Sequence, residues 1–214
     1  MAALTESQHA EDFIVSEAQG SYSRDAVTVL SGQTLKAGHV VGKVALGAGS
    51  SAAKAGNTGD GAMGAITVGA GAKVGAYKLT IIEPASDAGQ FIVEDPDGVN
   101  VGSGTVAVAF TGGGISFTLA DGSVNFISGD QFTITVAAGS GKVKEWNPAN
   151  TDGSAVVAGV LCSAVDASAA DKPGVMLVRV AEVNGAELYW FSGASGGNKT
   201  TGKAGLATLG VVAR

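Results

Sequence analysis

Short β-rich runs recur at nearly regular spacing through the middle of this chain, and this rhythm constrains the fold more than any other feature. Between residues 65 and 137 the runs are AITV, AYKLTIIE, QFIVED, TVAVAF, ISFTLA and QFTITVA. Glycine, aspartate, asparagine and proline fill the intervals, which is typical of short strands joined by turns in a small sandwich or barrel. We therefore expect a β-sandwich-like domain in this part of the chain.

Two stretches of small residues border these runs. Residues 47–61 read GAGSSAAKAGNTGDG and residues 138–141 read AGSG, compositions typical of linkers. The runs outside them, HVVGKVAL and GKVKEW, then resemble the two arms of one hairpin whose tip carries an inserted domain, because insertions are best tolerated at loop tips. We predict an outer domain of residues 21–46 plus 141–214, and an inserted domain of residues 47–140 with glycine-rich hinges.

The outer domain also consists of strand-like runs. AVVAGVLCSAV, KPGVMLVRVAEV, AELYWFSG and GLATLGVVA follow one another after residue 154, and Asn184-Gly185 between two of them predicts a hairpin. The chain contains 34 glycines, and each glycine destabilises a helix interior by about 1 kcal/mol relative to alanine. We therefore expect a mostly β protein, and GGNKTTGKAG at 196–205 predicts a loop better than a helix.

The amino-terminal residues 1–20 are polar apart from the trio Phe13, Ile14 and Val15. The small apolar surface of this trio does not offset the conformational entropy that the segment would lose on becoming ordered by itself. We therefore expect a flexible arm. These residues do not show the basic and apolar regions of a secretory signal, and no stretch approaches 18 uninterrupted apolar residues. The sequence predicts a protein made and kept in a reducing cytoplasm.

Charge and metal-ligand spacing exclude several functions. The formal net charge is −6, without basic blocks, which argues against binding to nucleic acid or to an anionic membrane. Cys162 is the single cysteine, and it lies inside an apolar run typical of a buried hydrophobic position. With His9 and His39 far from it in sequence, no metal-ligand spacing exists, and we expect neither metal nor cofactor.

One motif suggests a hydrolase. Residues 193–197, GASGG, match the G-x-S-x-G pattern in which Ser195 would be the nucleophile. In that hydrolase order the histidine follows the serine, whereas His9 and His39 both precede it. A glycine-rich loop is the preferred interpretation, so we do not expect an enzyme, and the hydrolase remains an alternative.

Acidic and aromatic groups have structural interpretations too. The turn Glu94–Gly98 carries three carboxylates but not the pattern of a calcium loop, so we expect a solvated acidic rim. Trp146, Tyr189, Trp190 and Phe191 are expected to anchor the core or a subunit contact. A platform for carbohydrate is the alternative for these four aromatics. For the whole chain, the alternative is a surface adhesin or fibre module whose β insert binds sugar.

The order of elements in the outer domain resembles a known family. KVKEWNPANTDGSAVVAGVLCSAVDA, followed by GVMLVRVAEVNGAELYW and GLATLGVVAR, is similar to the head decoration protein of lambda-like tailed phages. SRDAVTVLSGQTLKAGHVVGKV resembles the longer prophage members, which carry an inserted β domain like residues 62–137. The family would place a helical segment at SGASGGNKTTGK, where the glycines of this chain favour a loop.

The resemblance implies a structural protein of the virion and not an enzyme. It implies a homotrimer on the outer surface of the phage head, seated at three-fold sites of the expanded capsid, where it clamps the major capsid protein. A flexible arm could add a strand to an exposed sheet edge of that partner, with Phe13, Ile14 and Val15 as the capsid-binding residues. Three weak arms on one trimer would reinforce one another.

Overall fold

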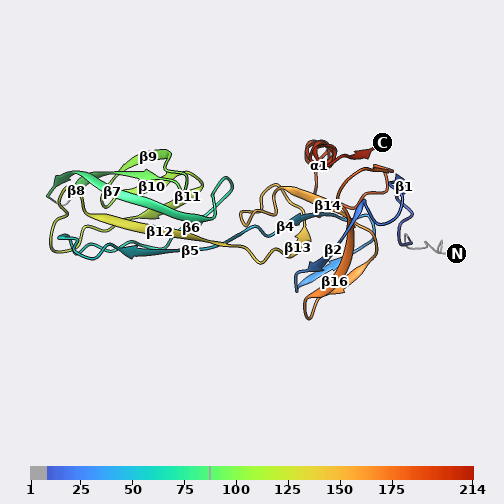
Figure 1. The fold of residues 1–214 in the computed structure, drawn as a ribbon, viewed down its shortest axis with the longest axis horizontal. Coiled ribbons are helices and arrows are strands. Elements are labelled where there is room, and N and C mark those ends of the chain that lie inside the picture. The colour runs from blue at the N-terminus through green and yellow to red at the C-terminus, as the bar shows by residue number, and fades with distance from the viewer. Residues whose placement is uncertain (1–8, 87) are drawn as a thin grey trace. The chain divides into compact units, whose positions relative to one another are not determined.

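The protein is mostly β, as its composition predicts. A computed structural model describes residues 9–86 and 88–214, which form eighteen strands and one helix (Figure 1). The chain packs into two compact units. Unit 1 joins the chain up to Val44 to Gly141–Arg214, and unit 2 is Ala45–Ser140. Within the described ranges, no helix has the length and hydropathy needed to cross a bilayer.

Unit 1 contains ten short strands and the helix. Their bounds are β1 (Ile14–Glu17), β2 (Arg24–Val29), β3 (Gln33–Leu35), β4 (Val40–Lys43), β13 (Val143–Glu145), β14 (Val157–Leu161), β15 (Val165–Ala167), β16 (Lys172–Leu177), β17 (Ala181–Val183), α1 (Gly196–Thr208) and β18 (Val211–Ala213). Five of the strands close into a barrel in the order β13-β2-β16-β14-β4, and β15 pairs with β3 beside it. The barrel surrounds a cluster of apolar side chains that includes Val29, Val41 and Leu161.

The strands that leave and re-enter unit 1 are neighbours in this barrel. β4 and β13 pair antiparallel, with Val41 opposite Glu145 and Lys43 opposite Val143. Beyond them, Val44 N–H donates to Lys142 O at 2.9 Å and Gly141 N–H donates to Val44 O at 2.9 Å. The two runs that resemble the arms of one hairpin in the sequence are therefore joined by hydrogen bonds up to the residues where unit 2 begins.

A separate three-stranded sheet in unit 1 has the order β1-β17-β18. β17 pairs antiparallel with β1 and parallel with β18. The hairpin predicted at Asn184-Gly185 is therefore wrong, because β17 does not pair with the segment that follows the turn. That segment continues to Tyr189, which forms a parallel bridge with His39. Asn-Gly favours a tight turn, but the partners of β17 come from the two ends of the chain.

The prediction of a loop at residues 196–205 is also wrong, because helix α1 covers Gly196–Thr208. Ser195 caps its first turn: its Oγ accepts from Asn198 N–H at 3.2 Å, and Asn198 Oδ1 accepts from Ser195 N–H at 3.0 Å. Gly202 is buried, and a Cβ there would lie 2.1 Å from Cζ3 of Trp190. The glycine that lowers helix propensity thus allows the helix to pack directly on the Trp190 ring, so tertiary packing overrides propensity.

Unit 2 contains the remaining eight strands. They are β5 (Leu46–Ala53), β6 (Thr67–Val68), β7 (Gly75–Ala85), β8 (Ala88–Glu94), β9 (Asn100–Thr105), β10 (Ala109–Gly112), β11 (Ile115–Thr118) and β12 (Gln131–Ala138). They form a five-stranded sheet, β5-β12-β7-β8-β9, and a three-stranded sheet, β10-β11-β6. Alternate residues of β12 are buried and exposed, which is the period-two pattern expected from QFTITVA.

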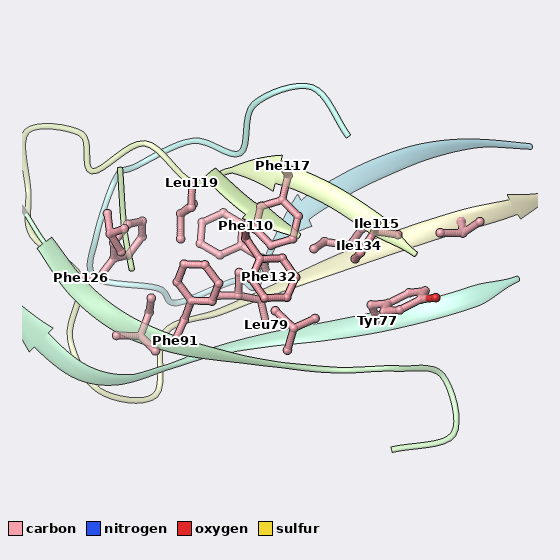
Figure 2. Close-up of a cluster of buried hydrophobic side chains, with 14 residues drawn as sticks. Tyr77, Leu79, Phe91, Phe110, Ile115, Phe117, Leu119, Phe126, Phe132 and Ile134 are labelled. Atoms are coloured by element: carbon pink, nitrogen blue, oxygen red, sulfur yellow. The ribbon is translucent and has the colours of Figure 1, made fainter. Parts of the chain in front are cut away.

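The core of unit 2 lies between its two sheets (Figure 2). Phe91 of the five-stranded sheet packs against Phe110 and Phe117 of the three-stranded sheet, with ring centroids 5.7 and 6.0 Å apart. Phe126, in the loop before β12, packs edge-on against Phe132 at 5.7 Å. These contacts between sheets show that unit 2 has a hydrophobic core of its own.

The predicted linker at 47–61 is wrong in its first half, because residues 46–53 form strand β5. β5 pairs antiparallel with β12, from Ala53 opposite Phe132 to Gly49 opposite Val136. A Cβ on Gly49 would lie 2.5 Å from Cγ2 of Ile66, so the small residues here serve close packing. Composition alone did not separate a flexible linker from a strand of small residues.

Candidate functional site

Of the three residues predicted to bind a capsid, Phe13 directly precedes β1, and Ile14 and Val15 begin it. Phe13 is fully buried among the apolar side chains of unit 1, Ile14 is half-buried and pairs with Val183, and Val15 is 60% exposed. The prediction of a flexible arm is wrong for residues 13–17, because β17 and the core of unit 1 supply the burial that the trio lacks by itself. Residues 1–8 of the predicted arm lie outside the described residues.

Arg24 holds both ends of this amino-terminal segment. Its guanidinium donates two hydrogen bonds to the Glu17 carboxylate, at 2.8 and 2.6 Å, and a third to Glu11 at 2.5 Å. The hydrogen bond from Arg24 holds the pKa of Glu11 below its ordinary value. Glu11 N–H also donates to Cys162 O at 3.0 Å. The turn before β1 and the end of β1 are thus fixed to β2 by one side chain.

Ser23 fixes the chain on the other side of β1. This serine is fully buried, accepts from Ala18 N–H at 3.0 Å and donates to Val180 O at 2.8 Å. Val180 has φ of 43°, in the left-handed region that a β-branched residue rarely adopts, and its side chain is 52% exposed. Ser23 therefore holds an exposed valine in a strained backbone conformation.

A shallow hollow of about 330 Å³ lies over the β1-β17-β18 sheet. Its lining includes Glu17 and Ala18 from the amino-terminal segment, Val180 and Glu182 around β17, and the carboxyl-terminal Val212 and Arg214. Sequence reasoning missed the carboxyl-terminal contribution. Val180 and Val212 stand in ordinary strand-like runs, and only the pairing of both chain ends with β17 brings them beside β1.

Ser195, the candidate nucleophile, is engaged in capping α1. Its hydroxyl donates to Asn198 Oδ1 at 2.8 Å and accepts from the backbone N–H of the same residue. His39 is buried elsewhere in unit 1, where its Nδ1 accepts from Lys36 N–H at 3.1 Å and its Nε2 lies 3.0 Å from Glu145. The geometry gives Ser195 a role as a helix cap.

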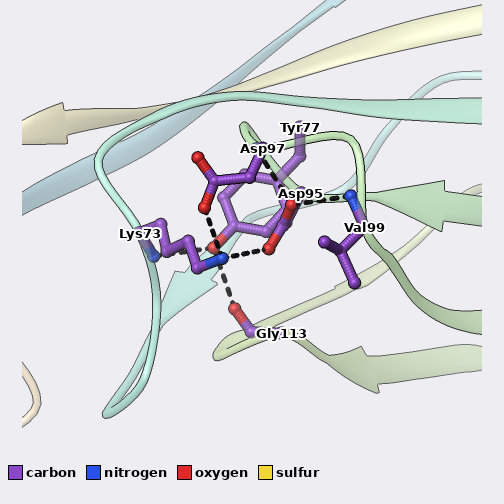
Figure 3. A network of polar contacts seen from close by, with 6 residues as sticks. All are labelled: Lys73, Tyr77, Asp95, Asp97, Val99 and Gly113. Atoms are coloured by element: carbon purple, nitrogen blue, oxygen red, sulfur yellow. Dashed lines mark hydrogen bonds and ion pairs between the residues drawn. The ribbon is translucent and has the colours of Figure 1, made fainter.

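One lysine pairs with two of the three carboxylates in the acidic turn of unit 2 (Figure 3). Lys73 Nζ donates to Asp95 at 2.5 Å and to Asp97 at 2.6 Å, which lowers the pKa of Asp95 and raises that of Lys73. Asp95 is 6% exposed and also accepts from Val99 N–H, so the predicted solvated rim is wrong for this carboxylate. Over the part of the chain that the structure describes, no group of three or more potential metal-ligating side chains is placed to hold an ion.

The aromatic residues do not form an exposed platform in unit 2. All of its aromatic side chains are buried, namely Tyr77, Phe91, Phe110, Phe117, Phe126 and Phe132. In unit 1, Trp146 is buried and packs edge-on against Trp190 and Phe191, as the core interpretation expects. Cys162 is buried as predicted, and burial raises the pKa of its thiol to about 11.

A comparison with known protein families gives a match over nearly the whole chain. A family model described as bacteriophage lambda head decoration protein D matches residues 3–211. The chain belongs to this family. It is a family of structural head proteins and not of enzymes, and membership supports a role in decorating the capsid of a phage head.

Other comparisons add little. No curated protein sequence matches the chain. Two crystal structures of FlgL from Xanthomonas campestris, in space groups H3 and C2, each share 20% sequence identity with this chain at a TM-score of 0.34. The matches cover 50% of this chain, and 34% and 33% of the two FlgL chains, respectively. The flagellar junction protein FlgL from Legionella pneumophila shares 16% identity at a TM-score of 0.35, over 49% of this chain and 37% of that one. The match spans about a third of these proteins, and TM-scores this low assign neither fold nor function.

Proposed function

We propose that this decoration protein binds the expanded phage capsid as a trimer at three-fold sites and stabilises it against internal pressure. The observation that carries the proposal is the family match over residues 3–211, which takes in both structural units. The partner is the major capsid protein, so the working location is the outer surface of the virion head.

The proposed capsid-binding segment is Phe13, Ile14 and Val15, in which the side chain of Val15 is the exposed one. Phe13 anchors β1 in the core, so it fixes the strand without meeting the partner. Val15 is exposed, and β1 is an edge strand of its sheet. An edge strand with an exposed valine can accept a strand of the capsid protein, with main-chain hydrogen bonds supplying affinity.

Trimerisation would multiply this contact. Three copies of β1 on one ring engage a three-fold site together, and linking weak contacts raises the overall affinity by about 10² to 10⁴. Light scattering of the purified protein tests this point. The expected mass is three times that of the 20.9 kDa chain, and a single-chain mass at all concentrations would contradict the trimer.

Stabilisation has its own test. DNA-filled heads without decoration protein are mixed with the purified chain, heated, and assayed for DNA accessible to a nuclease. We expect decorated heads to retain DNA at temperatures where bare heads release it. Equal release from decorated and bare heads would contradict the stabilising role.

Unit 2 is proposed to be an inserted module that trimerisation does not need. Val44 and Gly141 are joined by a hydrogen bond, so a two-residue Asn-Gly turn can close the chain in place of residues 45–140. We expect this shortened protein to remain a trimer, with a mass in solution three times that of the shortened chain. Aggregation or dissociation of the shortened protein would show that unit 2 contributes to assembly.

A further inference from the structure

We propose that the hollow over the β1-β17-β18 sheet receives an uncharged, apolar segment of the major capsid protein. The inference rests on the proposed function and adds a docking position that the carboxyl-terminal strand helps to form. Its support comes from the charges around the hollow, its exposed valines, and the conformation of Val180.

The two glutamates that line the hollow, Glu17 and Glu182, are each paired with an arginine of unit 1. Glu17 accepts two hydrogen bonds from Arg24, and Glu182 pairs with Arg214 and accepts from the Ser16 hydroxyl at 3.4 Å. Burying an unpaired charge under a partner is costly, whereas paired charges need no counter-charge from it. The hollow therefore favours a partner segment that carries no charge.

Apolar side chains stand exposed in the hollow and next to it. Val180 is 52% exposed and Val212 is 47% exposed, and both line the hollow. Val15, at 60% exposure, lies on the edge strand of the same sheet. Exposed apolar groups that gather on a surface mark interaction sites, and β1, the strand proposed to contact the capsid, supplies Ser16 and Glu17 to the lining of this hollow.

The backbone at Val180 favours a binding role over a purely structural one. A β-branched residue in the left-handed region costs free energy, and an exposed side chain recovers little of that cost by packing in the free protein. The Val180 carbonyl is nevertheless held in place, because it accepts hydrogen bonds from the buried Ser23 hydroxyl at 2.8 Å and from Ala18 N–H at 3.3 Å. The valine is thus presented rigidly to whatever enters the hollow.

Val180→Gly separates the two roles, because glycine adopts positive φ without strain. We expect a midpoint of thermal unfolding at least equal to that of the unchanged protein. We also expect about fivefold weaker binding to expanded empty heads, because glycine offers the partner no apolar side chain to bury. Binding is measured by sedimentation with the heads. A variant that keeps both its stability and its full affinity would overturn the inference.

Val212→Asp provides a second variant, which places a charge in the hollow. We expect binding to expanded heads to fall at least about tenfold, because the carboxylate would lose water under the partner and would lie opposite Glu182, which already pairs with Arg214. Val156→Asp is the matched control, because Val156 is 72% exposed, belongs to the same unit and does not line the hollow. Equal binding by the two aspartate variants would overturn the inference.

The outcomes distinguish this inference from the function on which it rests. If the unchanged protein does not sediment with expanded heads, the proposed function fails and the inference fails with it. If it does sediment and Val212→Asp sediments equally well, only the inference is overturned. If Val212→Asp instead changes the mass of the protein in solution, the hollow is a contact between copies of this chain, and the inference is likewise overturned.

Discussion

Replacing Phe13 by alanine tests whether the amino-terminal segment is part of the core of unit 1. The Phe13 ring is fully buried in a cluster that includes Trp146, Val183 and Leu188. Truncating a buried phenylalanine to alanine costs about 3–5 kcal/mol, through reduced burial and the cavity left behind. Domains have a total stability of about 5–15 kcal/mol, so the variant should lose a large fraction of the stability of unit 1.

Tryptophan fluorescence can follow this loss in one unit alone. The chain has two tryptophans, Trp146 and Trp190, and both lie in unit 1, so fluorescence during urea unfolding reports that unit. We expect Phe13→Ala to lower the midpoint of this transition. The matched control is Val15→Ala, which removes an exposed side chain two residues away and should change stability by less than about 0.5 kcal/mol.

A control in unit 2 completes the experiment. Phe132→Ala removes a buried ring from the other core and should leave the tryptophan transition unchanged while lowering a transition followed by far-ultraviolet circular dichroism. The reasoning would be refuted if Phe13→Ala destabilised unit 1 no more than Val15→Ala does. Residue 13 would then lie outside the core, as a free arm requires.

Three further predictions concern single side chains. Gly202→Ala should lower the stability of unit 1, measured by tryptophan fluorescence, because a Cβ would lie 2.1 Å from the Trp190 ring. Helix propensity alone predicts a gain in stability, and such a gain would contradict the close packing. Burial lowers the pKa of His39 in the folded protein. Below about pH 6.5 the unfolded chain therefore binds the proton more readily than the folded one. The stability of unit 1 should consequently fall as the pH drops below that value. His39→Gln should flatten this part of the profile, and an unchanged slope would show that another group causes it. The hydrogen bond from Lys73 lowers the pKa of Asp95, so the stability of unit 2 should fall as the pH drops below about 4. Circular dichroism should show a smaller loss of stability for Asp95→Asn over the same pH range. An equal loss in the variant and the unchanged protein would contradict the prediction.

The sequence predicted the β character well, because period-two alternation is a local property. In QFTITVA the buried positions are Phe132, Ile134 and Val136, as the alternation requires. Cys162 was predicted to be buried because it stands in a continuous apolar run, and it is. Such inferences need only the immediate neighbours of a residue.

The sequence failed where distant segments decide the structure. Phe13 is isolated in the sequence, because most of the core cluster that contains it lies more than a hundred positions away, including β17 and the segment around Leu188. Gly202 argued against a helix, because nothing local indicates that Trp190 will lie against it. The hollow cannot be predicted from the sequence for the same reason, because it forms only when β1 and β18, from the two ends of the chain, both pair with β17.

The central claim, that this family member decorates a phage head, is tested most directly by sedimenting the purified full chain with expanded and with unexpanded empty heads of its own phage. The account predicts that the protein pellets with expanded heads, at saturating amounts that correspond to three copies for each three-fold site, and stays in the supernatant with unexpanded ones. Protein that remains in the supernatant with both kinds of head would contradict the account.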